Sequence, residues 1–320
     1  MKRKIKIIFL CYHYIERQGD FKRLWAHSRE QFKSHLDFLR KNYPPVDFND
    51  VVSFVKGEAY NLSAKCSVLT FDDGLKEHCS FFAKYLDKLN LKAIFNIPAC
   101  ILRGEPSNPQ IVHFGTAYYG IRNFFRFAKE EIKRIYPEEA KLFPDDKKLR
   151  LMAVREAMKK LFWRKLGCRI TRETLMKIYE RHIKKDFPGF MDDAHLNNNE
   201  IITLAKNGHS IGAHTDTHYN VKELYKDEEA FKEEVIKPKI KLEKLIGKKV
   251  EIFSYPFGAK ADIISDPGVF EKIGYKAIFT AFQEERKLDL LNIGRYLVQS
   301  KDSIGILKNN TWEYEISNNK

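Results

Sequence analysis

The sequence lacks two features that would define a class at once: a hydrophobic run long enough to cross a membrane, and paired cysteines. The apolar run Ile7–Leu10 is short, and no small-residue cleavage site follows it before His13, so a buried strand explains it better than a signal peptide. The five cysteines form no CxxC pair and have apolar neighbours, which is typical of reduced thiols. These absences argue against a membrane-spanning or disulfide-stapled protein and predict a cytoplasmic one.

Acidic residues are also in deficit. The chain has 43 Asp+Glu against 57 Lys+Arg, which gives a net charge of +14. This excess favours an anionic partner, such as nucleic acid, a phosphate-bearing substrate or a membrane surface; the alternative is a lysine-rich solvated surface. Because the sequence has no recognised nucleic-acid-binding module and its basic residues are spread along the chain, nucleic acid is not an expected partner.

The 320 residues contain no internal repeat, and 43% of them are hydrophobic, which suits a globular protein with a core. An apolar strand at Cys66–Phe71, an amphipathic helix and a strand at Ala93–Ile97 follow one another, an order typical of a parallel α/β sheet or barrel. Further strands are predicted at Ile5–His13, His209–His214, Glu251–Ser254, Lys276–Thr280 and Ile293–Val298, and a long charged helix at Glu228–Ile246.

The alternation stops between about Leu102 and Ala194, where the sequence becomes helical, basic and aromatic. We expect residues 1–320 to form one domain, with residues 102–194 as a helical insertion. Because this segment follows the strand Ala93–Ile97, it leaves the sheet at its carboxyl edge, where the loops of parallel barrels build the substrate pocket. We therefore expect the insertion to form a lid beside a site at that edge.

Two adjacent carboxylates, Asp72 and Asp73, directly follow the strand Cys66–Phe71 and precede Gly74. Two adjacent carboxylates at a strand end repel each other unless a positive charge lies between the two groups. One aspartate can then complete a metal site while its neighbour takes a proton. The alternative is a solvated turn or a helix N-cap.

Two histidines four residues apart, His214 and His218, follow another predicted strand. On a helical turn their side chains would lie about 5–6 Å apart, close enough to bind one zinc ion. Two exposed or core histidines are the alternative. Because the aspartates and the histidines both lie at strand ends, they predict a hydrolytic metal site with three N/O ligands and an open position.

Thr70–Gly74 (TFDDG) and Gly212–His218 (GAHTDTH) together resemble the first two motifs of the polysaccharide deacetylase family, and Ser254–Gly258 (SYPFG) resembles the third. The resemblance covers most of residues 1–100 and 196–300. It implies an α/β fold, a distorted (β/α) barrel of the polysaccharide deacetylase type, here with a large helical insertion. It also implies metal-dependent N-deacetylation of a glycan such as chitin, peptidoglycan or poly-N-acetylglucosamine.

By the positions of its motifs, the resemblance implies that Asp72 is the general base and that Asp73, His214 and His218 bind the metal. The peptide N–H of Phe257 would help to bind the oxyanion. Zinc is the first expectation, since two imidazoles and one carboxylate suit it; Co²⁺, Ni²⁺ or Fe²⁺ would accept the same ligands.

The sequence departs from the family pattern at two places. Many members have an arginine, which steers the catalytic aspartate, where this chain has Ser254. Arg295 is the candidate to supply that charge, and a surface or salt-bridging arginine is the alternative. The late Leu-x-His motif is absent, but the N-terminal strand ends at His13, as in circularly permuted members such as poly-N-acetylglucosamine deacetylases. First and last strands of a closed barrel are neighbours, so His13 is expected to be the general acid, with a core histidine as the alternative.

The resulting hypothesis is a metal-dependent hydrolase that removes an N-acyl group, most simply acetyl, from an amino sugar. The basic charge favours a phosphate- or lipid-linked substrate, and with it peripheral contact to the inner membrane surface. The alternatives are a deformylase or esterase acting on a lipid- or nucleotide-linked sugar, and a non-catalytic glycan-binding protein. The aromatic residues of the insertion are expected to pack mainly as a core, with stacking on sugar rings as the alternative: Tyr118, Tyr119, Phe124, Phe125 and Phe127.

Overall fold

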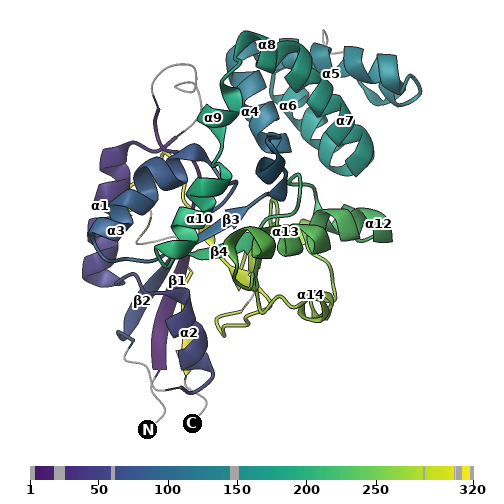
Figure 1. The fold of residues 1–320 in the computed structure, drawn as a ribbon. Helices are drawn as coiled ribbons and strands as arrows, with labels where there is room; N and C mark the ends of the chain where they lie inside the picture. Colours follow the sequence, from purple (N-terminus) through teal and green to yellow (C-terminus); the bar gives the residue numbers. More distant parts are fainter. Residues whose placement is uncertain are drawn as a thin grey trace.

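The computed structural model is a parallel barrel with helices around it and a group of helices above one end (Figure 1). It describes residues 4–17, 26–58, 62–144, 151–283, 285–305, 307 and 312–317. Residues 145–150 of the expected insertion, and 308–311 near the C-terminus, lie outside these ranges. No helix within them is long and apolar enough to span a bilayer. The five cysteines are free thiols.

Eight parallel strands form the barrel, and a ninth, β9, pairs antiparallel with β1. The strands are β1 Lys4–Tyr12, β2 Lys65–Phe71, β3 Ile94–Ile97, β4 Ser210–Ala213, β5 Ile252–Ser254, β6 Ala277–Thr280, β7 Ile293–Gly294, β8 Tyr296–Leu297 and β9 Tyr314–Ser317.

The barrel is closed by one short segment, 293–297, which the sequence predicted as part of a single strand. It is interrupted at Arg295, so that it forms β7 on one side and β8 on the other. β7 pairs with β6 and β8 pairs with β1, which links the two edges of the sheet. The predicted distorted (β/α) barrel is therefore confirmed, and the strands of the prediction lie where it placed them to within a few residues.

The two-residue alternation of the strands creates two layers inside the barrel. The lower layer is a buried apolar cluster that includes Phe9, Val68, Ile94, Ile252, Phe279 and Ile293. Two residues further along five of these strands, the inward positions are polar but equally buried: Cys11, Thr70, Asn96, Ser254 and Arg295. The apolar layer thus forms the floor beneath a polar layer at the carboxyl ends of the strands.

Helices cover the outside of the barrel. The helix α1 has a capping box in which Ser28 and Gln31 satisfy each other's backbone N–H groups. The cap of α10 is Asn197, whose side chain accepts from the N–H of Glu200. The helices of this layer are α1 Arg29–Asn42, α2 Phe48–Val55, η2 His78–Ala83, α3 Lys84–Lys88, α10 Asn198–Lys206, α11 Val221–Leu224, α12 Glu228–Phe231, η8 Lys232–Ile236, α13 Lys237–Ile246, η9 Lys260–Asp262 and α14 Gly268–Ile273.

The helices between β3 and α10 stand above the end of the barrel toward which the parallel strands point (Figure 1). Phe124 and Phe125 are fully buried among them, Tyr119 and Phe127 are partly buried, and Tyr118 remains more exposed. These elements are η3 Ala99–Arg103, α4 Asn108–Tyr119, α5 Ile121–Ile135, η4 Glu139–Leu142, α6 Leu151–Lys160, η6 Leu161–Lys165, α7 Cys168–Ile178, η7 Tyr179–Ile183, α8 Lys184–Asp186 and α9 Phe190–Ala194.

Candidate active site

Asp73, His214 and His218 converge at the carboxyl ends of β2 and β4. The Nε2 atoms of both histidines lie 3.4 Å from Asp73 Oδ1, and the three candidate ligand atoms lie within 4.8 Å of one another. All three side chains are buried. The structure thus brings together the three residues that the sequence predicted as metal ligands.

The histidines do not lie on a helical turn, as the spacing had suggested. They lie on a loop after β4, in which Thr215 and His218 have positive φ values of 58° and 67°. The hydroxyl of Thr215 accepts a hydrogen bond from the N–H of His218 at 2.9 Å. This loop, rather than helical spacing, turns both imidazoles toward Asp73.

The donor set of this cluster fits a divalent cation. His214 Nδ1 lies 2.8 Å from the carbonyl oxygen of Ser254, so it carries the proton and leaves the Nε2 lone pair facing Asp73. Burial lowers the pKa of His218 to about 3, so this imidazole is neutral at pH 7. Asp73 Oδ1 is buried without a hydrogen-bond donor. Three acceptor atoms that face one another repel unless a cation lies between them.

The Asp73 carboxylate is ionised in this setting. Burial raises its pKa, but the imidazoles of His214 and His218 beside the carboxylate lower it by more, so the pKa lies below its usual value. The tight turn after the carboxylate requires Gly74, because its φ is +58° and a Cβ there would lie 2.8 Å from Ile101 Cδ1.

Asp72 is held by donors from β3, from β5 and from the break between β7 and β8. Arg295 makes a two-point contact, with Nη1 2.8 Å from Oδ1 and Nη2 2.7 Å from Oδ2. Asn96 Nδ2 donates to Oδ1 at 2.7 Å, and the hydroxyl of Ser254 donates to Oδ2 at 3.1 Å. Burial raises the pKa of Asp72, but the Arg295 guanidinium outweighs it and holds this pKa well below the ordinary range. Arg295 is therefore at Asp72 and not on the surface; it is 2% exposed.

Asn96 is a site residue that sequence reasoning missed. Its signal was a polar residue inside the apolar strand Ile94–Ile97. Asn96 is opposite Gly212 on β4, and a Cβ at Gly212 would lie 2.1 Å from Asn96 Oδ1. Glycine at that position therefore leaves room for the amide that orients Asp72.

His13 lies at the end of β1, close to Asp72. The ligand atoms of Cys11, His13 and Asp72 lie within 4.8 Å of one another, and His13 is half-buried. The carbonyl oxygen of His13 lies 3.3 Å from Nε2 of His78. Because His78 Nδ1 accepts from the N–H of Leu75, Nε2 carries the proton and donates it to that carbonyl. Burial lowers the pKa of His78 to about 3, so it is neutral at pH 7.

A second buried histidine, His195, ties the loop after Asp73 to the start and end of the insertion. Its Nδ1 lies 3.2 Å from the carbonyl oxygen of Gly74, and its Nε2 accepts from the N–H of Ser107 at 3.2 Å. Burial lowers its pKa to about 4. Nothing in the local sequence around His78 or His195 indicated these contacts.

Phe257 lies beside the cluster of Asp73, His214 and His218, with its ring centroid 5.0 Å from that of His218. Its N–H has no hydrogen-bond acceptor among the described residues. Its φ is +66°, which is unfavourable for a bulky residue. Five described non-glycine residues have positive φ, and all except Asn90 belong to this site: Asp73, Thr215, His218 and Phe257. Such local strain is concentrated at functional sites.

The histidine loop is supported from outside by Glu234 and Asp216. The buried Glu234 carboxylate accepts from the N–H groups of Asp216 and Thr217 at 3.1 and 2.8 Å. Asp216 in turn binds Arg103 and Lys241.

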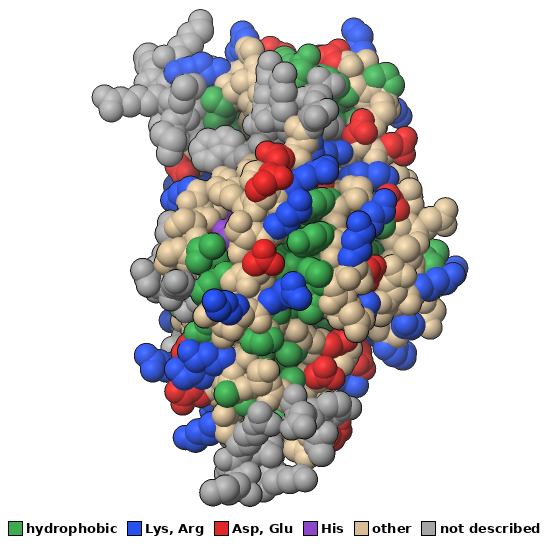
Figure 2. Space-filling view, turned by 90° about the vertical axis from the view of Figure 1, so that its left-hand side faces the viewer, with side chains coloured by type: hydrophobic (Ala, Val, Ile, Leu, Met, Phe, Trp, Pro, Cys, Tyr) green, Lys and Arg blue, Asp and Glu red, His purple; other side chains and the backbone are tan. Residues whose placement is uncertain are grey.

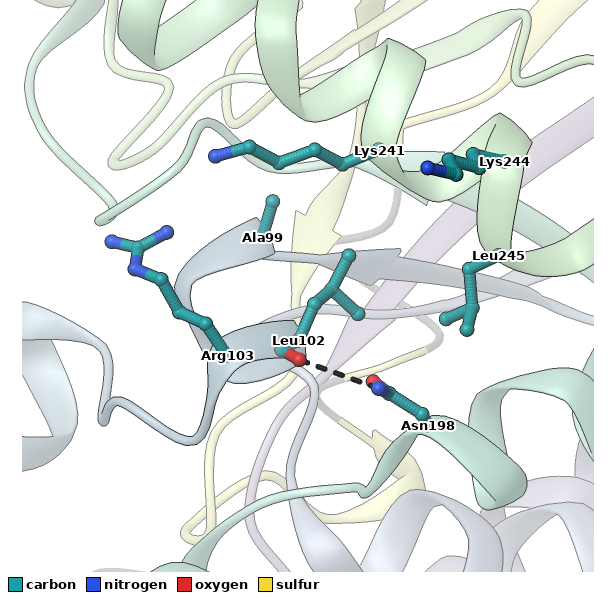
Figure 3. A pocket seen from close by; sticks show the side chains of 7 residues that line it. All are labelled: Ala99, Leu102, Arg103, Asn198, Lys241, Lys244 and Leu245. Carbon is teal, nitrogen blue, oxygen red and sulfur yellow. Dashed lines mark hydrogen bonds between the residues drawn. The ribbon is translucent and has the colours of Figure 1, made fainter.

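The side chains of Arg103 and Lys241 lie in an open pocket between η3, α10 and α13 (Figure 3). Asp72, Asp73, His214 and His218 do not line this pocket, so it is separate from the candidate active site.

The fold and the site together define the class of protein. It is a parallel barrel in which one carboxylate and two imidazoles are arranged as they would be for a metal, with a second carboxylate beside them. Residues 174–278 match the model of the polysaccharide deacetylase family, which confirms the resemblance to that family. This matched region contains His214, His218 and Phe257, whereas Asp72 and Asp73 lie outside it. No curated protein matches the sequence.

Several solved structures share the fold. A de-N-acetylase from Aggregatibacter actinomycetemcomitans is 17% identical, with 95% of this chain and 99% of that one covered and a TM-score of 0.58. The deacetylase PplD from Streptococcus pyogenes, solved with acetate, is 14% identical, with 95% and 97% covered and a TM-score of 0.56. IcaB from Ammonifex degensii is 16% identical, with 92% of each chain covered and a TM-score of 0.54. At these identities the similarity concerns the fold.

Proposed function

We propose that the chain is a metal-dependent hydrolase that removes an N-acetyl group from an amino sugar in a glycan or glycan precursor. The observation that carries the proposal is the convergence of Asp73, His214 and His218 beside a second carboxylate, Asp72, that Arg295 fixes in place. The match of residues 174–278 to the polysaccharide deacetylase family supports the substrate class. Two of the proteins that share the fold, from Streptococcus pyogenes and Aggregatibacter actinomycetemcomitans, are a deacetylase and a de-N-acetylase.

Asp73, His214 and His218 would hold the cation, with zinc as the first candidate because of its preference for this donor set. When bound, a divalent cation supplies a Lewis acid and lowers the pKa of a water molecule. The hydrogen bond from His214 Nδ1 to the Ser254 carbonyl leaves the Nε2 lone pair of His214 free to bind the cation. Burial keeps His218 neutral, so that its imidazole can also bind.

Asp72 is the proposed proton acceptor. Its four lone-pair sites face four donors: Asn96, two nitrogens of Arg295 and the hydroxyl of Ser254. Of these, only the Ser254 hydroxyl hydrogen can rotate away without moving a side chain. We therefore assign the accepted proton to Asp72 Oδ2. The remaining donors keep the carboxylate oriented while it receives that proton.

His13 is the proposed proton donor to the leaving amine. It is half-buried, so it can contact both solvent and substrate, and His78 holds its carbonyl. Phe257 presents a backbone N–H that can donate to the oxygen on which negative charge develops. Each of these roles is independent of which sugar carries the acyl group.

We further propose that the substrate is phosphate- or lipid-linked, in the cytoplasm and at a membrane surface. The net charge of +14 and the five free thiols support this location. The face shown in Figure 2 carries lysines and arginines from top to bottom, interspersed with acidic and apolar side chains. This distribution suits weak contact over a broad surface better than one tight anion site.

Acyl release from matched substrates tests the function. The purified, metal-loaded protein is given N-acetyl, N-formyl and O-acetyl derivatives of one amino sugar, each as a neutral oligosaccharide and as a phosphate-linked sugar. We expect the highest kcat/KM on the N-acetylated, phosphate-linked form. Faster release of formate or of the ester-linked acetyl would favour the deformylase or esterase alternative. No hydrolysis of any of them, with retained glycan binding, would favour a non-catalytic binding protein.

A further inference from the structure

We propose that the exposed ring of Phe257 forms a stacking platform for a pyranose ring of the substrate, and that Trp163, from the helices inserted between β3 and β4, packs against this ring and holds it in place. This inference rests on the proposed function and adds the subsite that selects for a sugar. It differs from the expectation for the insertion's other aromatic residues, since Phe124 and Phe125 are fully buried and have no face to offer a ligand.

The exposure and the backbone conformation of Phe257 are both unfavourable for the folding free energy. It is 36% exposed, and its φ of +66° is in the left-handed region that bulky residues avoid. A large apolar side chain gains little from folding if it remains in water. An exposed aromatic ring held in a strained backbone beside the candidate metal centre is therefore better explained by a ligand that covers it.

The surrounding rings fix the orientation of Phe257. The His218 ring packs edge-on to it at an interplanar angle of 89°, and the Trp163 ring lies 5.3 Å away at 49°. Trp163 is on η6, is 8% exposed, and is backed by Tyr219 with a centroid distance of 6.2 Å. An aromatic row thus runs from a candidate metal ligand to the insertion. A substrate whose acyl group is at the metal would lie along this row.

The chemistry of the row favours the C–H face of a neutral sugar over a charged group. None of the cation–π contacts between described residues involves Phe257 or Trp163. The neighbouring cation, Arg164, binds Asp262 at 2.9 Å. Aromatic faces with few polar groups are typical linings of small-molecule sites, and they offer a pyranose ring apolar contact.

The test compares a sugar substrate with one that contains no sugar. Trp163→Ala is assayed on a tetramer of N-acetylglucosamine and on p-nitrophenyl acetate, both with the metal-loaded protein. We expect kcat/KM on the tetramer to fall about tenfold, mainly through KM, with the ester reaction within about twofold of wild type.

Phe162→Ala is the matched control. Phe162 is the preceding residue on η6, is 1% exposed and belongs to the buried core. This variant should lose thermal stability without changing the ratio of tetramer to ester activity. Equal losses on both substrates in Trp163→Ala, or no loss on the tetramer, would overturn the platform.

The outcome also separates the platform from the proposed function. If the wild type binds the tetramer without hydrolysing it, the proposed function fails, but the platform is still tested by the tetramer's Kd from calorimetry. A Kd about tenfold weaker in Trp163→Ala than in Phe162→Ala supports the platform. Equal Kd values in the two variants contradict it.

Discussion

Individual side chains in this site are held by residues from distant parts of the chain. Asp72 receives Asn96 from β3, Ser254 from β5 and Arg295 from the break between β7 and β8. The family pattern shows an arginine at the position of Ser254, and here the guanidinium enters from another strand. Arg295 also donates to the Ser254 hydroxyl at 2.8 Å, so the two residues share the space in front of Asp72.

Replacing Arg295 with Lys tests whether the two-point contact matters beyond its charge. Lysine keeps a positive charge but cannot bind both oxygens of Asp72 in the geometry of a guanidinium. We expect kcat to fall about 10- to 100-fold, a share of what general acid–base catalysis contributes, with metal content unchanged. Ser254→Ala is the control, since it removes one rotatable donor, and it should stay within about threefold of wild type. Wild-type kcat in Arg295→Lys would remove Arg295 from the mechanism.

At the scale of elements, the order of apolar strands and amphipathic helices was enough to predict a parallel α/β sheet or barrel, and the family resemblance implied the barrel. The strand Ile293–Val298 was also predicted, but its interruption at Arg295 was not, because pairing with two different neighbours is decided by barrel closure. The candidate ligands were predictable because the motifs are local. The loop that orients them was not, because its positive φ values are supported by Glu234, a residue of another element.

The buried histidines that brace these loops predict a pH dependence of stability. An unfolded histidine titrates near pH 6.5, whereas the pKa values of His78 and His195 are lowered to about 3 and about 4. Between these pH values the unfolded chain binds protons that the folded chain does not, so the free energy of unfolding falls as the pH falls. Glu77 acts in the opposite direction, because burial raises its pKa to about 7 and the folded chain keeps its proton below that pH.

Two histidines outweigh one glutamate, so these three groups give a net loss of about 1 kcal/mol per pH unit near pH 5.5. His78→Asn removes one histidine and should make this slope clearly shallower, although the variant is less stable at pH 7 because the bond to the His13 carbonyl is lost. Urea unfolding at pH 5, 6 and 7 measures both slopes. Parallel slopes for wild type and variant would show that His78 is not the neutral, buried group described above.

For the whole molecule, the insertion and the barrel are joined at the site. Asn108 donates from its backbone to the Thr217 carbonyl at 3.1 Å, and Cys168 contacts Glu234, which holds the same loop. Trp163 reaches Phe257. The segment 102–194 interrupts the recognisable pattern in the sequence, yet in space it contacts the histidine loop directly. We therefore propose that the insertion forms a wall of the candidate active site.

The central claim is that Asp73, His214 and His218 form a site for one divalent metal. It is tested most directly by the metal content of the purified protein, measured by inductively coupled plasma mass spectrometry after loading with zinc and removal of the excess. The claim predicts about one metal ion per wild-type chain and about one in Asp72→Asn, since Asp72 is not a ligand. It predicts almost none in the double variant His214→Ala with His218→Ala, and full occupancy in that variant would contradict it.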